Sequence, residues 1–203
     1  MPGNIRAVIF DLGGVLVGFK GQAFLQETLS FVPMANIVEW NNSTAELQRL
    51  FELGLLQEQE FFEKLQPLMK KKLSFQQFCK KWSDFFTFRP KVFGLLAKLK
   101  AAGYKIGILS NTNALHWSWI KKHYNFDSAV DAVVTSFECH CLKPDKKIFN
   151  SVLAGLQEKP ENCIYIDDLP KYVDAARALG FNAIQYKSLS QMKKELSEFG
   201  VLK

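Results

Sequence analysis

The chain has 203 residues, 48% of them hydrophobic and 23% charged, a balance typical of a globular protein with a sizeable core. Its formal net charge of +6 would attract anionic ligands, but no basic stripe with interleaved aromatic residues accompanies it, so we expect no nucleic-acid partner. No uncharged apolar run reaches the roughly 18 residues of a membrane span, and MPGNIR lacks a signal-peptide pattern, so we expect a cytoplasmic protein with no membrane partner.

The first predicted element is a buried strand, AVIF, which lies between Arg6 and Asp11. Four consecutive apolar residues bounded by charged ones are typical of a strand that is covered on both faces. Two adjacent glycines, Gly13 and Gly14, follow the acid. An acid between a buried strand and a glycine-rich turn is a candidate ligand-binding residue.

The next segment, from Phe19 to Phe88, is predicted to be helical throughout. It contains two pairs with the spacing of a helix capping box, Ser43 with Glu46 and Ser74 with Gln77. Its apolar residues form two stripes with helical spacing, Phe61-Phe62-Leu65-Leu68 and Phe75-Phe78-Trp82-Phe85. About seventy residues are too many for a crossover between strands. We therefore expect 19–88 to form a small all-helical cap domain, and 1–18 with 89–203 to form the main domain.

Beyond Pro90, which can open a helix, predicted helices and strands alternate. Amphipathic helices are expected at Lys91–Ala102, Ala114–His123, Lys146–Gly155 and Val173–Leu179. Strands are expected at KIGIL before Ser110, AVVT before Ser136, CIYI before Asp167 and NAIQY before Lys187. This alternation predicts parallel strands joined by right-handed crossovers, which is an open, doubly wound α/β domain.

Polar residues follow the carboxyl ends of the predicted strands, where open α/β sheets bind their ligands. They are Asp11, Ser110-Asn111-Thr112, Lys143 in the loop after the third strand, and Asp167-Asp168. Carboxylates that are close together need a cation to ionise at the same time, and oxygen ligands suit Mg²⁺. The lysine and the hydroxyl and amide donors would then hold an anionic group.

The four cysteines, Cys79, Cys139, Cys141 and Cys163, are expected to be reduced thiols. Cys139-His140-Cys141 is similar to part of a metal clip. Its spacing is too short for a usual zinc pair, however, and no second Cys/His pair accompanies it. We expect no metal there.

Taken together, the ordered motifs resemble those of the haloacid dehalogenase (HAD) superfamily, in its phosphatase-type branch with a helical cap inserted after the first strand. The resemblance is carried by FDLGGVLV, LLAKLKAAGYKIGILSNTN, SFECHCLKPDKKIF and IYIDDLPKYVDAARALGFNAI. It implies a Rossmann-like, mainly parallel sheet and Mg²⁺-dependent hydrolysis of a small phosphate monoester, sugar phosphates included. The small anionic substrate would be the main partner of a monomer or homodimer.

The resemblance also implies a role for each motif residue. Asp11 would be the nucleophile that becomes an aspartyl phosphate, and it would share Mg²⁺ with the Gly13 carbonyl and with Asp168. Asp167 would support Asp168. Ser110 and Lys143 would act in catalysis by binding the phosphoryl group, with Asn111 nearby and with Gly14 allowing backbone amides to approach the phosphoryl oxygens.

Two positions depart from the family pattern. Gly13 stands where these phosphatases usually carry a second Asp, which protonates the leaving alcohol and then activates water. Tyr172 stands where the last motif tends to have Asn or Asp. Loss of general acid–base help would slow an enzyme and spare its binding. His116 and Tyr172 are the first alternatives for the missing acid.

His116 and Trp117 are also candidates for substrate contact, with ordinary helix packing as the alternative. For the whole protein, two alternatives to a phosphatase remain open. One is a phosphate-binding or regulatory HAD-like protein with little or no turnover, which Gly13 favours. The other is a 2-haloacid dehalogenase that forms an ester on Asp11, a metal-independent reaction that the Asp167-Asp168 pair argues against.

Overall fold

The main sheet has five strands in the computed structural model, which describes residues 4–21, 30–33, 37–124 and 129–202. The strands are β1 (Ala7–Phe10), β4 (Lys105–Ser110), β5 (Ala132–Thr135), β6 (Cys163–Asp167) and β7 (Asn182–Gln185). Their order is β5-β4-β1-β6-β7, and each neighbouring pair is parallel. The predicted doubly wound α/β fold is therefore confirmed, and each strand lies on one of the predicted apolar runs.

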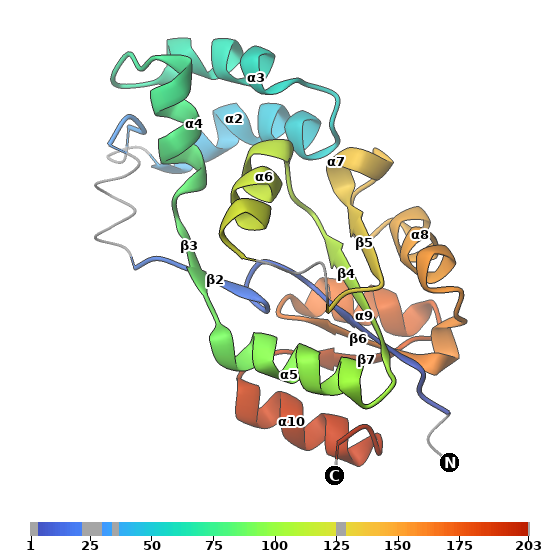
Figure 1. Cartoon of the computed structure of the whole chain (residues 1–203). Helices are drawn as coiled ribbons and strands as arrows, with labels where there is room; N and C mark the ends of the chain where they lie inside the picture. Colours follow the sequence, from blue (N-terminus) through green and yellow to red (C-terminus); the bar gives the residue numbers. More distant parts are fainter. Residues whose placement is uncertain (1–3, 22–29, 34–36, 125–128, 203) are drawn as a thin grey trace.

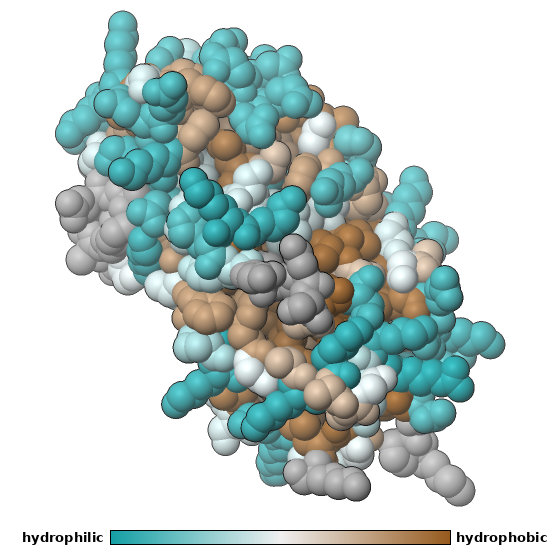
Figure 2. Space-filling view, in the orientation of Figure 1, coloured by the Kyte–Doolittle hydropathy of each residue, from teal (hydrophilic) through white to brown (hydrophobic). Residues whose placement is uncertain are grey.

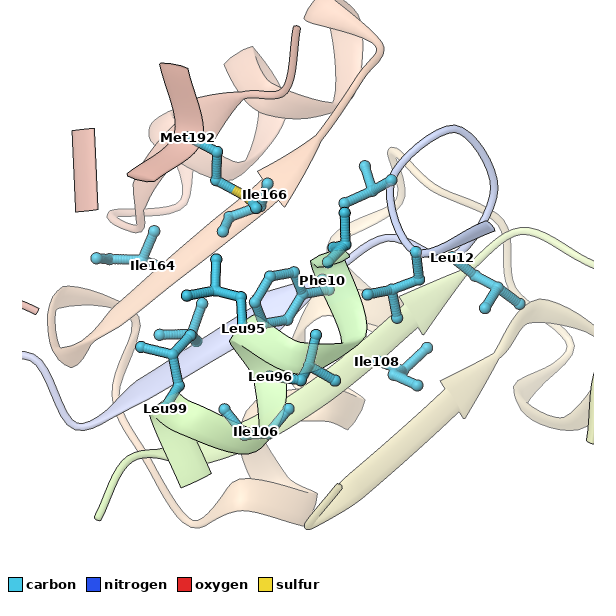
Figure 3. Close-up of a cluster of buried hydrophobic side chains, with 14 of the residues drawn as sticks. Phe10, Leu12, Leu95, Leu96, Leu99, Ile106, Ile108, Ile164, Ile166 and Met192 are labelled. Atoms are coloured by element: carbon cyan, nitrogen blue, oxygen red, sulfur yellow. The ribbon is translucent and has the colours of Figure 1, made fainter. Parts of the chain in front are cut away.

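Helices cover both faces of this sheet (Figure 1). One face packs against α5 (Pro90–Ala101), α6 (Ala114–His123) and α10 (Leu189–Glu198), and the other against α8 (Lys146–Leu156) and α9 (Pro170–Ala178). Side chains alternate along β1, so Val8 and Phe10 enter the first core whereas Ala7 and Ile9 enter the second. In the first core, leucines of α5 lie over Phe10 and its neighbours on the sheet (Figure 3).

The inserted segment contributes α2 (Ile37–Glu52), α3 (Glu58–Leu65), the short 3₁₀ helix η2 (Gln66–Leu68) and α4 (Phe75–Ser83). These helices lie together beyond one end of the sheet (Figure 1). They share an apolar cluster of their own, in which the rings of Phe51 and Phe61 stack with centroids 4.2 Å apart. Leu115 of α6 packs against that cluster. A domain boundary at residues 18/19 and 88/89 stays a prediction.

The segment is not helical throughout, which corrects the expectation for 19–88. Two short strands, β2 (Val17–Phe19) and β3 (Phe86–Phe88), pair in antiparallel fashion where the chain leaves the main sheet and returns to it. Exposure rises along β3 from the buried Phe86 to Phe88, which is 43% exposed. Phe85 does not belong to the predicted helical stripe, because α4 ends at Ser83.

Two further helix signals had different outcomes. The predicted capping box at Ser74 is confirmed, because its Oγ accepts a hydrogen bond from the Gln77 amide and the Gln77 side chain accepts one from the Ser74 amide. The predicted capping box at Ser43 and Glu46 was wrong, because Ser43 lies in the middle of α2 and not at its start. The short helix α7 (Ser136–Cys139) and the 3₁₀ helix η3 (Pro160–Asn162) were not predicted.

Figure 2 shows hydrophilic side chains around most of the outline of the molecule and hydrophobic ones in the middle of the same face. Among the described residues, no helix has the length and apolar character needed to cross a membrane.

Candidate active site

Three carboxylates meet at the carboxyl ends of two neighbouring strands, β1 and β6. Asp11 directly follows β1, Asp167 is the last residue of β6, and Asp168 comes next. Each residue offers one oxygen atom that lies within 4.8 Å of the others. Ser110, at the end of the neighbouring strand β4, is buried at the same edge of the sheet. The parallel order of β4, β1 and β6 is what places these residues side by side.

Lys143 is buried among these acids and bonds to two of them. Its Nζ lies 2.7 Å from Asp11 Oδ1 and 2.7 Å from Asp167 Oδ2, and it donates to the Tyr165 hydroxyl at 3.0 Å. Burial alone would lower the pKa of Lys143, but Asp11 and Asp167 outweigh burial and raise it above its usual value. The side chain is therefore a fixed positive charge beside Asp11.

One ammonium group does not balance three carboxylates. Burial raises the pKa of Asp11 to about 7, because Lys143 offsets only part of the lost hydration and Asp167 adds to the rise. Burial also raises the pKa of Asp168, and the Asp167 carboxylate adds to that shift. A divalent cation would remove this penalty, so the charge of the site fits Mg²⁺.

The two acids of the last motif have different environments. Asp167 is fully buried and is held by Lys143, by the Tyr165 hydroxyl and by the Leu169 amide, which donates to Oδ1 at 2.9 Å. The Asp168 carboxylate makes no hydrogen bond with another residue in the described part of the chain. Asp168 is thus the carboxylate that is open to a cation, and Asp167 is the one that supports Lys143.

The glycine turn after Asp11 differs in one respect from the expectation. Gly14 has φ +80°, and a Cβ there would lie 2.3 Å from Asp168 Oδ2, so the missing side chain makes room for the Asp168 carboxylate. Its own amide donates to the Val17 carbonyl at 2.8 Å and so is not directed to a phosphate. The Gly14 carbonyl accepts a 2.5 Å hydrogen bond from Arg89 Nη1. Gly14 therefore shapes the turn, and its expected role in letting backbone amides approach the phosphate stays a prediction.

The Asn111 side chain positions Lys143, and its expected phosphate contact stays a prediction. Its Oδ1 accepts a hydrogen bond from the Lys143 amide at 2.7 Å. Its Nδ2 donates to the Lys143 carbonyl and to the Tyr172 hydroxyl, both at 3.2 Å. The side chain holds the backbone of Lys143 in place, so it positions the lysine.

A cavity of about 230 Å³ opens beside Gly13 and Ser110, between the strand ends and the inserted helices. It is lined by residues of both parts of the chain: Leu12, Gly13, Phe19, Glu52, Phe85, Phe86, Ser110, Asn111, Thr112, His116 and Ile120. Glu52, Phe19, Phe85 and Phe86 were not predicted as site residues. No sequence motif marks them, because only the packing of the inserted segment brings them to the strand ends.

Of the two substrate candidates on α6, only His116 lines this cavity. Burial lowers the pKa of His116 to about 4, although its hydrogen bond to the Trp82 carbonyl favours the charged form. The imidazole is therefore neutral at pH 7. Trp117 is buried in the core beside the sheet and is absent from the cavity lining, so its prediction as a substrate contact is corrected to helix packing.

The tripeptide Cys139-His140-Cys141 shows no metal-binding arrangement. Cys139 Sγ donates to backbone carbonyls, and His140 Nδ1 lies 2.8 Å from the Leu53 carbonyl oxygen. Within the described residues, the only group of three or more possible metal-ligating side chains is Asp11, Asp167 and Asp168.

A family model described as haloacid dehalogenase-like hydrolase matches residues 5–180. The match covers most of the chain, and the protein belongs to the haloacid dehalogenase-like hydrolases. Among curated relatives, the D-ribitol-5-phosphate phosphatase of Bacteroides thetaiotaomicron is 25% identical over 205 residues, which cover 95% of this chain and 97% of the relative.

Solved structures agree with this assignment. A HAD family enzyme from Bacteroides thetaiotaomicron has a TM-score of 0.84 at 25% identity, covering 95% of this chain and 98% of its own. The complex of that wild-type enzyme with magnesium and inorganic phosphate has a TM-score of 0.79 at 26% identity, covering 91% and 96%. The L-2-haloacid dehalogenase of Xanthobacter autotrophicus, at 19% identity and a TM-score of 0.64 over 98% of this chain and 85% of its own, shares the fold.

Proposed function

We propose that the protein is a Mg²⁺-dependent phosphatase that acts on small phosphate monoesters through an aspartyl phosphate on Asp11. The observation that carries the proposal is the position of Asp11, between the fixed positive charge of Lys143 and the open carboxylate of Asp168. A nucleophilic carboxylate, a cationic side chain and a cation site at one point suit the attack of an oxygen nucleophile on a phosphoryl group.

In this proposal, Asp11 and Asp168 hold the cation together with the Gly13 carbonyl, which accepts no backbone hydrogen bond within the described residues. When bound, Mg²⁺ offsets the negative charge of the phosphoryl oxygens. Lys143 and the Ser110 hydroxyl bind these oxygens and orient phosphorus toward Asp11. The Asp11 carboxylate forms a bond to phosphorus as the bond from phosphorus to the alcohol oxygen breaks. Water then hydrolyses the aspartyl phosphate and restores Asp11.

The cavity favours a small substrate with both polar and apolar parts. Its volume of about 230 Å³ and its lining of aromatic rings, backbone and Glu52 suit a phosphate ester of a few carbon atoms. The D-ribitol-5-phosphate phosphatase among the relatives supports polyol and sugar phosphates as the first class to examine.

The test is a panel of polyol phosphates, sugar phosphates and 4-nitrophenyl phosphate, with phosphate release measured in Mg²⁺ and in EDTA. We expect release in Mg²⁺ only, and none from the Asp11→Asn variant. Full activity in EDTA would contradict the mechanism and favour metal-independent ester chemistry, for which 2-chloropropionate is the substrate to try.

Gly13 favours a second candidate, a protein that binds phosphate without turnover. The same preparation distinguishes the two candidates. Binding of orthophosphate or vanadate in Mg²⁺, with no release from any ester of the panel, would support the binding protein.

A further inference from the structure

The site lacks an evident proton donor for the leaving oxygen. Gly13 has no side chain, and the two alternatives considered from the sequence are engaged elsewhere. His116 Nε2 lies 3.0 Å from the Trp82 carbonyl and Nδ1 lies 3.1 Å from Asn113 Nδ2, so both ring nitrogens are used. The Tyr172 hydroxyl accepts a hydrogen bond from Asn111, and Tyr172 is absent from the lining of the cavity.

Glu52 is the carboxylic acid that the inserted helices bring to the cavity. It is the last residue of α2 and lines the same cavity as Gly13 and Ser110. Its carboxylate makes no hydrogen bond or close ion pair with another residue of the described ranges. The residue is half-buried, so the group is directed neither to a protein partner nor fully to solvent.

The backbone around Glu52 is anchored to the main sheet region. Ser136 Oγ, at the start of α7, lies 2.6 Å from the Glu52 carbonyl oxygen. His140 Nδ1 lies 2.8 Å from the next carbonyl, that of Leu53. Gly54 packs so closely that a Cβ there would lie 2.1 Å from the Phe137 carbonyl oxygen. The end of α2 is therefore held at a defined position over the strand ends.

We propose that Glu52 is the general acid of this site and supplies, from the inserted helices, the carboxyl group that Gly13 lacks. The inference rests on the proposed phosphatase function and adds to it the residue that protonates the leaving alcohol.

The environment of Glu52 suits a proton donor. Burial raises its pKa, and the Lys171 ammonium on α9 opposes that rise. The other titratable group lining the cavity, His116, is neutral at pH 7. A phosphoryl group bound beside Glu52 adds negative charge and favours the protonated acid further.

The proton balance of the reaction is complete with this residue. In the first step, Asp11 bonds to phosphorus, the bond from phosphorus to the alcohol oxygen breaks, and the Glu52 proton moves to that oxygen to give the alcohol. In the second step, the Glu52 carboxylate takes a proton from water as the water oxygen bonds to phosphorus. The bond from phosphorus to Asp11 then breaks, which releases phosphate and restores both carboxyl groups.

The test compares two leaving groups in Glu52→Gln. Nitrophenolate is a good leaving group that departs without being protonated, whereas an alkyl leaving group must receive a proton as its bond to phosphorus breaks. We expect kcat to fall by about 10²-fold or more on the best alkyl phosphate of the panel and by less than about tenfold on 4-nitrophenyl phosphate. Glu39→Gln, at an exposed position near the start of the same helix, should change neither rate. Glu52→Asp, which keeps the carboxyl group, should retain more alkyl phosphatase activity than Glu52→Gln.

Vanadate binding by Glu52→Gln, within about threefold of the wild-type affinity, shows that the phosphoryl site is intact. Equal losses on both substrates, or no loss on either, would overturn the role of Glu52 and leave the phosphatase function standing. A wild type that cleaves 4-nitrophenyl phosphate but no alkyl phosphate would also overturn it. A wild type without any phosphatase activity would overturn both proposals.

Discussion

Lys143 shows why the acid after β1 is tolerated at the end of an apolar strand. Asp11 is buried, and an unpaired buried carboxylate would be costly. The lysine pairs with it and with Asp167, and Asn111 holds the lysine backbone through two hydrogen bonds. The charges are thus kept close together at the carboxyl ends of β1 and β6.

Replacing Lys143 with methionine should weaken binding of orthophosphate or vanadate by about tenfold or more, because a charge-assisted hydrogen bond is lost. Isothermal titration in Mg²⁺ measures the change. Lys147→Met, at an exposed position four residues along the chain, is the matched control. An unchanged affinity in Lys143→Met would place the phosphoryl group away from this lysine.

Position 13 allows a test of whether an aspartate there can replace Glu52 as the acid. A Cβ at this position would meet only the Phe19 ring, at 3.4 Å, so an aspartate fits with a small shift of that ring. In the Glu52→Gln background, Gly13→Asp should restore alkyl phosphate turnover by about tenfold or more, because general acid catalysis is regained. Steady-state rates of the single and double variants measure this rescue. A double variant as slow as Glu52→Gln would count against the interchange of the two carboxyl groups.

At the scale of elements, the contact between the end of α2 and α7 determines where Glu52 lies. The contact joins the Glu52 and Leu53 carbonyls to the side chains of Ser136 and His140, and Gly54 allows it through its small size and its φ of +67°. A change at this contact should alter the position of the acid and leave Asp11 and Lys143 unchanged.

Gly54→Ala should therefore lower alkyl phosphate turnover more than 4-nitrophenyl phosphate turnover. The added methyl group would meet the Phe137 carbonyl oxygen and displace the end of α2. Gly103→Ala is a matched control, because Gly103 also has a positive φ, +91°, but no neighbour within 4 Å of the added Cβ. The control should lose stability without selective loss of alkyl phosphatase activity. If Gly54→Ala lowered the turnover of both substrates by the same factor, the contact would not control the position of Glu52.

The elements of the main sheet were predictable from the sequence because each buried strand is a short apolar run, and β1, β4 and β6 also lead directly into residues of the site. The antiparallel pair of β2 and β3 was not, since three-residue strands are too short for a periodic signal and Phe85 and Phe86 continue the helical spacing of α4. Asp11, Lys143 and the Asp167-Asp168 pair were predictable from topology. Glu52 was not, because its position depends on tertiary contacts of α2.

At the scale of the whole molecule, His116 links the inserted helices to the main sheet region. Its Nε2 bonds to the Trp82 carbonyl at the end of α4, while Asn113, at the start of its own helix α6, holds Nδ1. Ser83 Oγ adds a second contact, 3.4 Å from the Leu115 carbonyl. The hydrogen bond from the Asn113 amide requires an unprotonated Nδ1, whereas the bond to the Trp82 carbonyl favours the charged imidazole; burial outweighs that bond and keeps the ring neutral.

The free energy of unfolding should therefore decrease as the pH is lowered from about 6.5 to about 4. The folded pKa of His116 is about 4, below the ordinary value of 6.5, so between these values the unfolded chain binds more protons. The contribution of His116 is fully present above pH 6.5 and is lost as pH falls toward 4. Urea unfolding at pH 7 and pH 5 should show a smaller loss in His116→Gln than in the wild type. The exposed His123→Gln should show the wild-type loss, and a wild-type loss in His116→Gln would contradict the assignment.

The pairing of β2 with β3 has a mechanical consequence. The chain passes between the main sheet and the inserted helices twice. The two passages form an antiparallel pair, in which Val17 lies opposite Phe88 and Phe19 lies opposite Phe86. The Lys20 amide donates a further hydrogen bond to the Phe85 carbonyl, and Lys20 Nζ lies 2.6 Å from Asp84 Oδ1. Two independent tethers would let the helices swing in any direction, whereas one twisted ribbon bends most easily about a single axis. Any movement of the inserted helices relative to the main sheet must therefore bend this ribbon or break its pairing.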